Sequence, residues 1–143
     1  MSIRKLISAR PTESQLGIAL ALLRVVVGVV FVAHGAQKLF VYGPEMVGQG
    51  FSQLGLPLPE LTAYLVSLAE FGGGMMLVAG ILTRLTSAVL LLIMLGAVFV
   101  AHLSQGFFMP DGFEFSMVLG AVSAALAIMG AGRYSMDHAL TKS

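Results

Sequence analysis

The stretch LGIALALLRVVVGVVFVAHGAQKLF, residues 16–40, is apolar over a length that can cross a membrane. A helix needs about 20 apolar residues to cross the hydrocarbon core of a bilayer. Three further stretches, at residues 61–82, 85–103 and 113–132, have similar length and composition. A soluble four-helix bundle keeps a polar face on each helix for water, and these segments leave almost none. The sequence therefore predicts an all-α membrane protein, a bundle of four transmembrane helices that forms a single domain over residues 1–143.

The composition agrees with this class and excludes others. Hydrophobic residues make up 57% of the chain and charged residues 10%, whereas soluble domains carry about 25% charged residues. Because 8 Lys and Arg nearly balance 7 Asp and Glu, there is no basic tract for nucleic acid and we expect no nucleic-acid partner. The absence of cysteine excludes disulfides, thiol redox chemistry and cysteine-ligated metals from this chain.

Positive charges predict the orientation of the helices. They lie before the first span, in a tight turn at residues 83–86 and after the last span: Arg4, Lys5, Arg10, Arg84, Arg133 and Lys142. The connections at residues 41–60 and 104–112 contain no Lys or Arg. By the positive-inside rule, both termini and the 83–86 turn face the cytoplasm. The 41–60 connection is also predicted to contain a short interfacial helix near residues 46–54.

Two features concern packing and symmetry. Gly28 and Gly35, and likewise Gly73 and Gly80, lie seven residues apart, and such small residues let neighbouring helices approach closely. The segments FVAHGAQKLF at 31–40 and FVAHLSQGFF at 99–108 are identical at six of ten positions. This match suggests a 2+2 internal repeat about an axis along the membrane normal. Coincidence is the alternative interpretation, because apolar segments resemble one another easily.

Two charged residues lie deep within the predicted spans. Arg24 is about 12 Å from the inner end of the first span, and Glu70 is about 16 Å from the inner side in the second, at about 1.5 Å per helical residue. A charge among lipid chains is costly unless it is paired or has a function. We predict an Arg24–Glu70 ion pair that neutralises both charges between neighbouring helices. Contact with a ligand is the alternative role.

A second polar group is predicted near the outer ends of the spans. His34 and Lys38 are one turn apart and share a helix face, and His102 is expected at a similar depth. The full candidate site is His34, Gln37, Lys38, His102, Gln105 and Glu114. Such a group could hydrogen-bond a quinone carbonyl or transfer protons, although these side chains could also simply reach headgroups and water. Two histidines can ligate haem iron, but no further signature supports haem or another metal.

A family resemblance is carried by residues spread in order along the chain. They are Leu23-Arg24, Gly28, Phe31, Gly35 and Lys38-Leu39-Phe40, then Leu54-Gly55-Leu56-Pro57, then Glu70, Gly73, Gly80 and Thr83-Arg84, and finally Gly132-Arg133-Tyr134-Ser135-Met136-Asp137. Over about residues 16–140 this order resembles the DoxX family of small bacterial membrane proteins. The ending is similar to the family's Gly-x-x-Ser-Leu-Asp, with Met136 in place of leucine.

The resemblance implies a four-helix protein of the bacterial inner membrane. Some members of the family are linked to quinone-dependent sulfur oxidation or to membrane oxidoreductase complexes, and most have no established activity. The first hypothesis is therefore a protein that binds a quinone or another amphipathic ligand as an accessory subunit of a membrane oxidoreductase system. The second is a non-enzymatic scaffold, and the third is a small oligomeric transporter. We predict no catalytic residue, and we expect the bilayer, oxidoreductase subunits and either further copies or a hetero-complex as partners.

Overall fold

The computed structural model describes residues 3 and 10–142, and over these residues it contains helices and no strand. The main helices are α2 (Glu13–Ala36), α3 (Pro44–Gln53), α4 (Pro59–Ala79), α5 (Thr83–Gly96), α6 (Glu114–Met129) and α7 (Met136–Thr141). Two π-helical segments, Gln37–Tyr42 and Ala97–His102, continue α2 and α5, and a 3-10 turn, Leu103–Gln105, follows the second. These helices confirm the predicted all-α class and the short helix in the first connection.

The helix boundaries follow from local chemistry. The first span begins at Glu13, earlier than predicted, because Thr12 and Gln15 cap it reciprocally: the Thr12 hydroxyl accepts from the Gln15 backbone, and the Gln15 side chain accepts from the Thr12 backbone. Gly80, at φ 73°, follows the last residue of α4, Ala79, so the helix ends three residues before the predicted end of the span. Gly130, at φ 82°, ends α6. Glycine tolerates this left-handed region, which other residues rarely adopt.

Three helical segments of the described chain are long and apolar enough to cross a membrane: Glu13–Tyr42, Pro59–Ala79 and Thr83–Gln105. The helix α6 is also apolar, but at 16 residues it is shorter than the predicted 113–132 span. A helix of that length is about 24 Å long at 1.5 Å per residue, against a hydrocarbon thickness of about 30 Å. The fourth span therefore stays a prediction.

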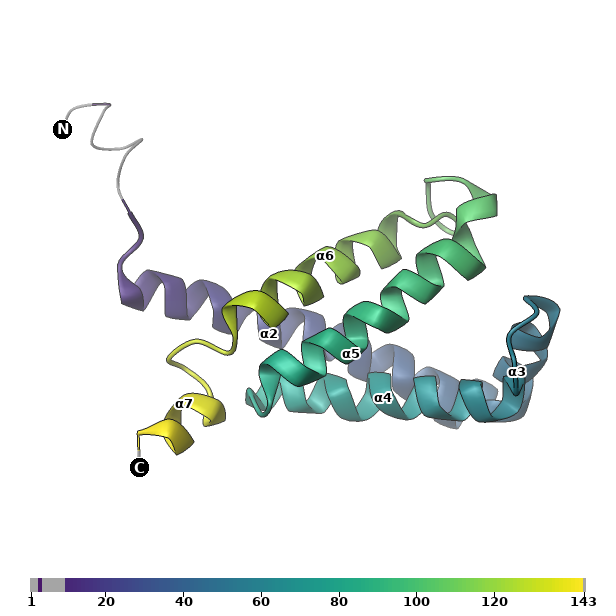
Figure 1. The fold of residues 1–143 in the computed structure, drawn as a ribbon, viewed down its shortest axis with the longest axis horizontal. Helices are drawn as coiled ribbons and strands as arrows, with labels where there is room; N and C mark the ends of the chain where they lie inside the picture. The colour runs from purple at the N-terminus through teal and green to yellow at the C-terminus, as the bar shows by residue number, and fades with distance from the viewer. Residues whose placement is uncertain (1–2, 4–9, 143) are drawn as a thin grey trace.

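Two helix pairs form the bundle, as Figure 1 shows. The helix α2 packs along α4, and α5 packs along α6, with the second pair crossing the first. The beginning of α2, the α4–α5 turn and α7 lie at one end of the bundle, which we call the α7 end. The helix α3 and the loop at residues 106–113 lie at the other, which we call the α3 end.

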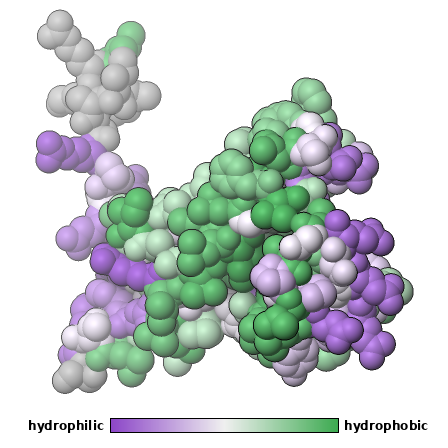
Figure 2. Space-filling view, turned by 45° about the vertical axis from the view of Figure 1, so that its right-hand side comes forward, coloured by the Kyte–Doolittle hydropathy of each residue, from purple (hydrophilic) through white to green (hydrophobic). Residues whose placement is uncertain are grey.

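The surface of the bundle matches a lipid environment. Large hydrophobic side chains such as Leu22, Val29 and Leu92 are more than half exposed. In Figure 2 hydrophobic residues cover the middle of the visible face, and hydrophilic residues gather toward its two sides. A soluble protein rarely exposes so continuous an apolar surface. The protein is therefore embedded in a membrane and contacts the lipid bilayer.

Glycines let α2 and α4 approach each other closely. A Cβ atom on Gly74 would lie 2.6 Å from the carbonyl oxygen of Gly28, and one on Gly28 would lie 2.8 Å from that of Gly74. Gly35 likewise rests against the backbone of Phe71. The predicted packing role of Gly28 and Gly35 is thus confirmed. Gly74 rather than Gly73 faces Gly28, and Gly80 ends the helix.

Replacing Gly74 with Ala is expected to destabilise the protein by about 1–3 kcal/mol, the usual cost of overpacking. The added methyl group meets backbone atoms of α2, which cannot move without separating the helices. Gly72→Ala is the matched control, because a Cβ atom there meets nothing within 4 Å. Unfolding in detergent micelles measures the effect. Equal stability of the two variants would contradict the close contact.

Candidate functional site

An ion pair near the α3 end joins α2 and α4. The Lys38 Nζ atom lies 2.7 Å from Oε1 and 2.6 Å from Oε2 of Glu70, so the ammonium group donates to both carboxylate oxygens. The Glu70 side chain is only 2% exposed and that of Lys38 is 25% exposed. This is the only ion pair among the described residues. The predicted Arg24–Glu70 pair is therefore wrong, since Glu70 is paired with Lys38.

Arg24 binds backbone carbonyls at the opposite end of the bundle. Its Nη1 atom donates to the Leu77 and Val78 carbonyls at 3.0 and 3.2 Å, and its Nη2 atom donates to the Tyr134 carbonyl at 2.6 Å. The last carbonyls of a helix lack partners within the helix and carry the negative end of its dipole. Carbonyls at the carboxyl end of α4 therefore accept hydrogen bonds from the buried guanidinium. Arg24 as a whole is 2% exposed.

The packing register of α2 against α4 explains most of the error. Gly28 lies against Gly74 and Val78, and Gly35 lies against Phe71, so Arg24 is level with the carboxyl end of α4 and Glu70 with the carboxyl end of α2. The direction of helical side chains separates the two residues further. Side chains lean toward the amino end of their own helix. Because α2 and α4 run in opposite directions (Figure 1), Arg24 leans toward the α7 end and Glu70 leans toward the α3 end. Lys38 lies beyond Glu70 along this axis and leans back toward it. Counting residues from the predicted span ends places Arg24 and Glu70 at one depth, but the observed packing offsets them along the bundle, and their side chains lean apart.

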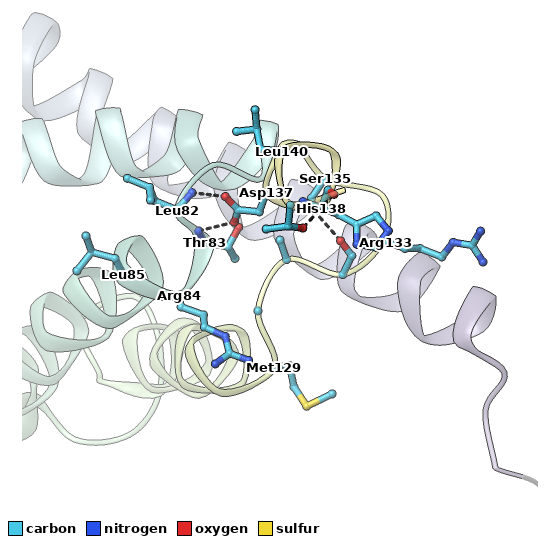
Figure 3. Close-up of a pocket in the computed structure, with 14 residues that line it drawn as sticks. Leu82, Thr83, Arg84, Leu85, Met129, Arg133, Ser135, Asp137, His138 and Leu140 are labelled. Atoms are coloured by element: carbon cyan, nitrogen blue, oxygen red, sulfur yellow. Dashed lines mark hydrogen bonds between the residues drawn. The ribbon is translucent and has the colours of Figure 1, made fainter. Parts of the chain in front are cut away.

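The sequence did not reveal a second set of contacts at the α7 end. These contacts are made by Asp137 (Figure 3), and we call them the Asp137 clamp. The Asp137 carboxylate accepts the backbone N–H groups of Leu82 at 2.7 Å and Thr83 at 2.9 Å, and so caps the beginning of α5. The Asp137 backbone N–H donates to the Gly80 carbonyl at 2.8 Å. Burial by itself raises the pKa of Asp137. The backbone hydrogen bonds and the charge of Arg24 outweigh burial and hold that pKa below its usual value.

The chain ending thus holds the bundle together. Ser135 caps α7 by accepting from the His138 backbone at 3.2 Å, and its hydroxyl donates to the Gly132 carbonyl at 2.6 Å. The signal for this clamp was present in the sequence as the Gly-x-x-Ser-Met-Asp ending. The pattern by itself shows the family resemblance but does not show which groups the Ser and Asp side chains contact.

Two cavities meet at the Lys38–Glu70 pair. The first, of about 440 Å³, is bordered by loop residues such as Met109 and Pro110, and we call it the loop cavity. The second, of about 430 Å³, is bordered by residues 51–56 at and after the end of α3, and we call it the α3 cavity. Four residues border both cavities: Lys38, Glu70, Ala97 and His102.

The two cavities have different walls. The α3 cavity is lined by apolar side chains except for Thr62 and the shared polar group, and it includes Leu92 and Val100 from the exposed face of α5 and its extension. The loop cavity adds His34 and Ser116 to the shared group. The polar centre therefore lies between an apolar compartment beside the lipid face and a compartment beside the exposed loop.

The histidines each use one ring nitrogen. Nδ1 of His34 lies 2.9 Å from the Val30 carbonyl oxygen, and Nδ1 of His102 lies 2.8 Å from that of Asp111. A carbonyl oxygen can only accept, so Nδ1 carries the proton in both bonds. Nε2 then accepts a hydrogen bond when the ring is neutral and donates one when it is charged. Lys38 has a third N–H beyond the two that bind Glu70.

The structure brings together only part of the predicted site. His34, Lys38 and His102 border the loop cavity. Glu70, which was predicted to pair with Arg24, borders this cavity as well. Gln37 and Gln105 are exposed and border neither cavity. Glu114 accepts the Met109 backbone N–H at 2.7 Å and so holds the loop instead. No group of three or more His, Cys, Asp or Glu residues able to hold a metal occurs among residues 10–142.

Comparisons with known proteins place the chain in context. The family model described as DoxX matches residues 19–103. The uncharacterized membrane protein Rv3486 of Mycobacterium tuberculosis is 34% identical over 134 residues, which cover 84% of this chain and 80% of that protein. "Putative oxidoreductase CatD" of Bacillus subtilis is 31% identical over 105 residues, covering 73% and 75%. No solved structure matches the chain.

Proposed function

This chain belongs to the DoxX family of membrane proteins, and from that premise we propose that it binds a quinone or a similar amphipathic ligand as an accessory subunit of a membrane oxidoreductase system. The observation that carries this proposal is the position of the Lys38–Glu70 pair and His102 at the junction of the two cavities. A quinone has a polar ring and an apolar tail, and this junction offers a place for each.

The α3 cavity suits the tail. Its volume of about 430 Å³ falls within the usual range of small-molecule sites, roughly 300–1,000 Å³. Its wall includes Leu92, which is 68% exposed on the lipid-facing side of α5. A lipid-soluble molecule can therefore approach from the acyl chains without passing through water. Residues Phe51 and Leu54 cover the cavity on the α3 side.

The shared polar group suits the ring. The third N–H of Lys38 can donate to a quinone carbonyl, and Nε2 of His102 can donate to it or accept from a quinol hydroxyl. Glu70 keeps the lysine in place by accepting its other two N–H bonds. The loop cavity leads from this group to exposed loop residues, which gives protons a route away from the ring.

The redox partner lies outside these residues. Lysine, glutamate and histidine bind and move protons but do not carry electrons at biological potentials. Electrons must therefore come from another subunit or a diffusing reductant, which supports an accessory role. The name of the Bacillus subtilis relative, "Putative oxidoreductase CatD", supports an oxidoreductase setting.

The proposed location is the bacterial inner membrane, with the α7 end in the cytoplasm. The described basic residues Arg10, Arg84, Arg133 and Lys142 lie beside α2's beginning, the α4–α5 turn and α7. The connections at the α3 end carry acidic residues and no Lys or Arg. The positive-inside rule then supports cytoplasmic termini.

Replacing Gly96 with Leu tests the proposal without touching the polar group. Gly96 borders the α3 cavity, and a Cβ atom there meets nothing within 4 Å, so the larger side chain enters open space. Affinity for ubiquinone-2 and menaquinone-2, measured by equilibrium dialysis in micelles, is expected to fall by about tenfold or more, which corresponds to about 1.4 kcal/mol.

Gly72→Leu is the matched control. Gly72 also lies within a helix, has open space around its Cβ position and borders neither cavity. The control is expected to bind quinone as the parent does. If Gly96→Leu binds quinone as well as the parent does, the quinone tail does not occupy the α3 cavity. Failure of the parent to bind either quinone would end the proposal.

A further inference from the structure

A third cavity, of about 620 Å³, opens at the α7 end between the beginning of α5, the end of α6 and α7. It is separate from the proposed quinone site, which lies at the α3 end. Figure 3 shows its lining residues, which include the basic Arg84 and Arg133, the apolar Leu82, Leu85 and Met129, and the acidic Asp137.

Arg84 is held at the wall of this cavity. Its side chain extends from the beginning of α5 toward the end of α6 (Figure 3), and a Cβ atom on Gly130 would lie 3.1 Å from its Nε atom. The glycine therefore leaves the space that the guanidinium stem occupies. The guanidinium of Arg133 points away along α2 in the same view. Arg84 is consequently the main cation of the cavity.

The positive charge is not neutralised within the described part of the chain. Neither Arg84 nor Arg133 has a carboxylate oxygen within 4.0 Å among the described residues. Asp137 is the acidic residue of the cavity wall, and its two oxygens accept the Leu82 and Thr83 backbone N–H groups. The cavity thus has donors and positive charge, and its one carboxylate forms no ion pair with Arg84 or Arg133.

The apolar part of the wall indicates what kind of anion fits. Leu82, Leu85 and Met129 are 55%, 63% and 48% exposed and lie where the spans end. A free anion gains nothing from these side chains, whereas the glycerol and upper acyl carbons of a lipid bury them. Arginine also binds phosphate oxygens through two parallel N–H bonds. Basic pockets between helices on the cytoplasmic side of membrane proteins recognise anionic headgroups in this way.

We propose that this cavity binds the phosphodiester headgroup of an anionic glycerophospholipid, with Arg84 as its principal contact and the acyl chains along Leu85 and Met129. The proposal stands whether or not the protein binds quinone. With the proposed orientation, the lipid belongs to the cytoplasmic leaflet.

The test compares the melting temperature in micelles with added phosphatidylglycerol, phosphatidylcholine or inorganic phosphate. Phosphatidylglycerol is expected to raise the melting temperature of the parent, and phosphatidylcholine and millimolar phosphate are not. Arg84→Gln is expected to lose more than half of the phosphatidylglycerol-dependent rise. Arg10→Gln removes a charge at the same end but outside the cavity, so it is expected to keep the rise.

The design separates lipid binding from helix capping. Arg84 lies beside the carboxyl end of α6, where a cation stabilises the helix dipole, so Arg84→Gln can lower the melting temperature in the absence of lipid. If this variant keeps the full phosphatidylglycerol rise, Arg84 only caps the helix and the proposal is overturned. An equal rise with inorganic phosphate or phosphatidylcholine would also overturn it, since the cavity would then not select an anionic lipid.

Discussion

Lys38→Met is expected to destabilise the protein by about 3–5 kcal/mol, the typical cost of removing one partner from a buried ion pair. Glu70 is 2% exposed, and among the described contacts Lys38 is the group that binds its carboxylate. Without the ammonium group, the carboxylate stays buried without a donor. Reversible unfolding in mixed detergent micelles measures the loss.

Replacing the other partner of the pair, Glu70, with Gln is expected to have a smaller effect on stability. In Glu70→Gln the amide still accepts one hydrogen bond, and Lys38, at 25% exposed, can extend toward water. We expect a loss of about 1–2 kcal/mol, close to that of one buried hydrogen bond. The double variant Lys38→Met, Glu70→Met should regain most of the stability, because an apolar pair needs no donor. A Lys38→Met protein as stable as the parent would show that the pair contributes nothing.

Arg24→Leu is expected to cost about 3–5 kcal/mol, because it takes donors from three carbonyls and each buried acceptor left unsatisfied costs about 1–3 kcal/mol. It removes the donors to the Leu77, Val78 and Tyr134 carbonyls and leaves Asp137 without the nearby cation. Arg24→Lys keeps the charge but cannot reproduce the planar fork of donors, so its loss should be intermediate. Thermal unfolding of the three proteins in one detergent compares them directly.

A double-mutant cycle distinguishes the observed contacts from the predicted Arg24–Glu70 pair. Arg24 and Glu70 bind different groups, at opposite ends of the bundle. The losses of Arg24→Leu and Glu70→Gln should therefore add within about 0.5 kcal/mol. A coupling energy well above that value would mean that the two residues do interact, and the described contacts would be wrong.

Most of the fold could be predicted from the hydrophobic pattern. Continuous apolar runs identify the helices because lipid requires an apolar surface on every side, and glycine spacing identified the α2–α4 contact. The pattern could not show the capping by Thr12, which lengthens the first span, or the positive φ of Gly130, which ends α6 before the predicted end of the fourth span. These boundaries depend on single hydrogen bonds and dihedral angles rather than on hydropathy.

The candidate site could be predicted in part, for a physical reason. Counting residues from a helix end gives the position of a side chain along its own helix, and for His34, Lys38 and His102 this was enough to predict a common level. Depth does not fix direction. Gln37 is one residue from Lys38, and a step of about 100° around the helix turns it out of the cavity. Glu114 is at the right level but binds the Met109 backbone in the loop.

The internal repeat stays a prediction. His34 and His102 occupy matching positions of the repeated segment and both border the loop cavity. Their surroundings differ, however. His34 bonds to a carbonyl of its own helix, and His102 bonds to the loop carbonyl of Asp111. The first π-helical segment begins after His34, and the second ends at His102.

Methyl NMR of the protein in micelles tests most directly whether the α3 cavity receives the ligand. We expect ubiquinone-2 to cause saturable chemical-shift changes at Val66, Leu92 and Ile93, which line the α3 cavity. Leu22 and Val25 lie on the lipid-facing surface of α2 and should not respond. Small, non-saturating shifts at all of these methyl groups alike would show that quinone only dissolves in the detergent, and would contradict a site at the Lys38–Glu70 pair.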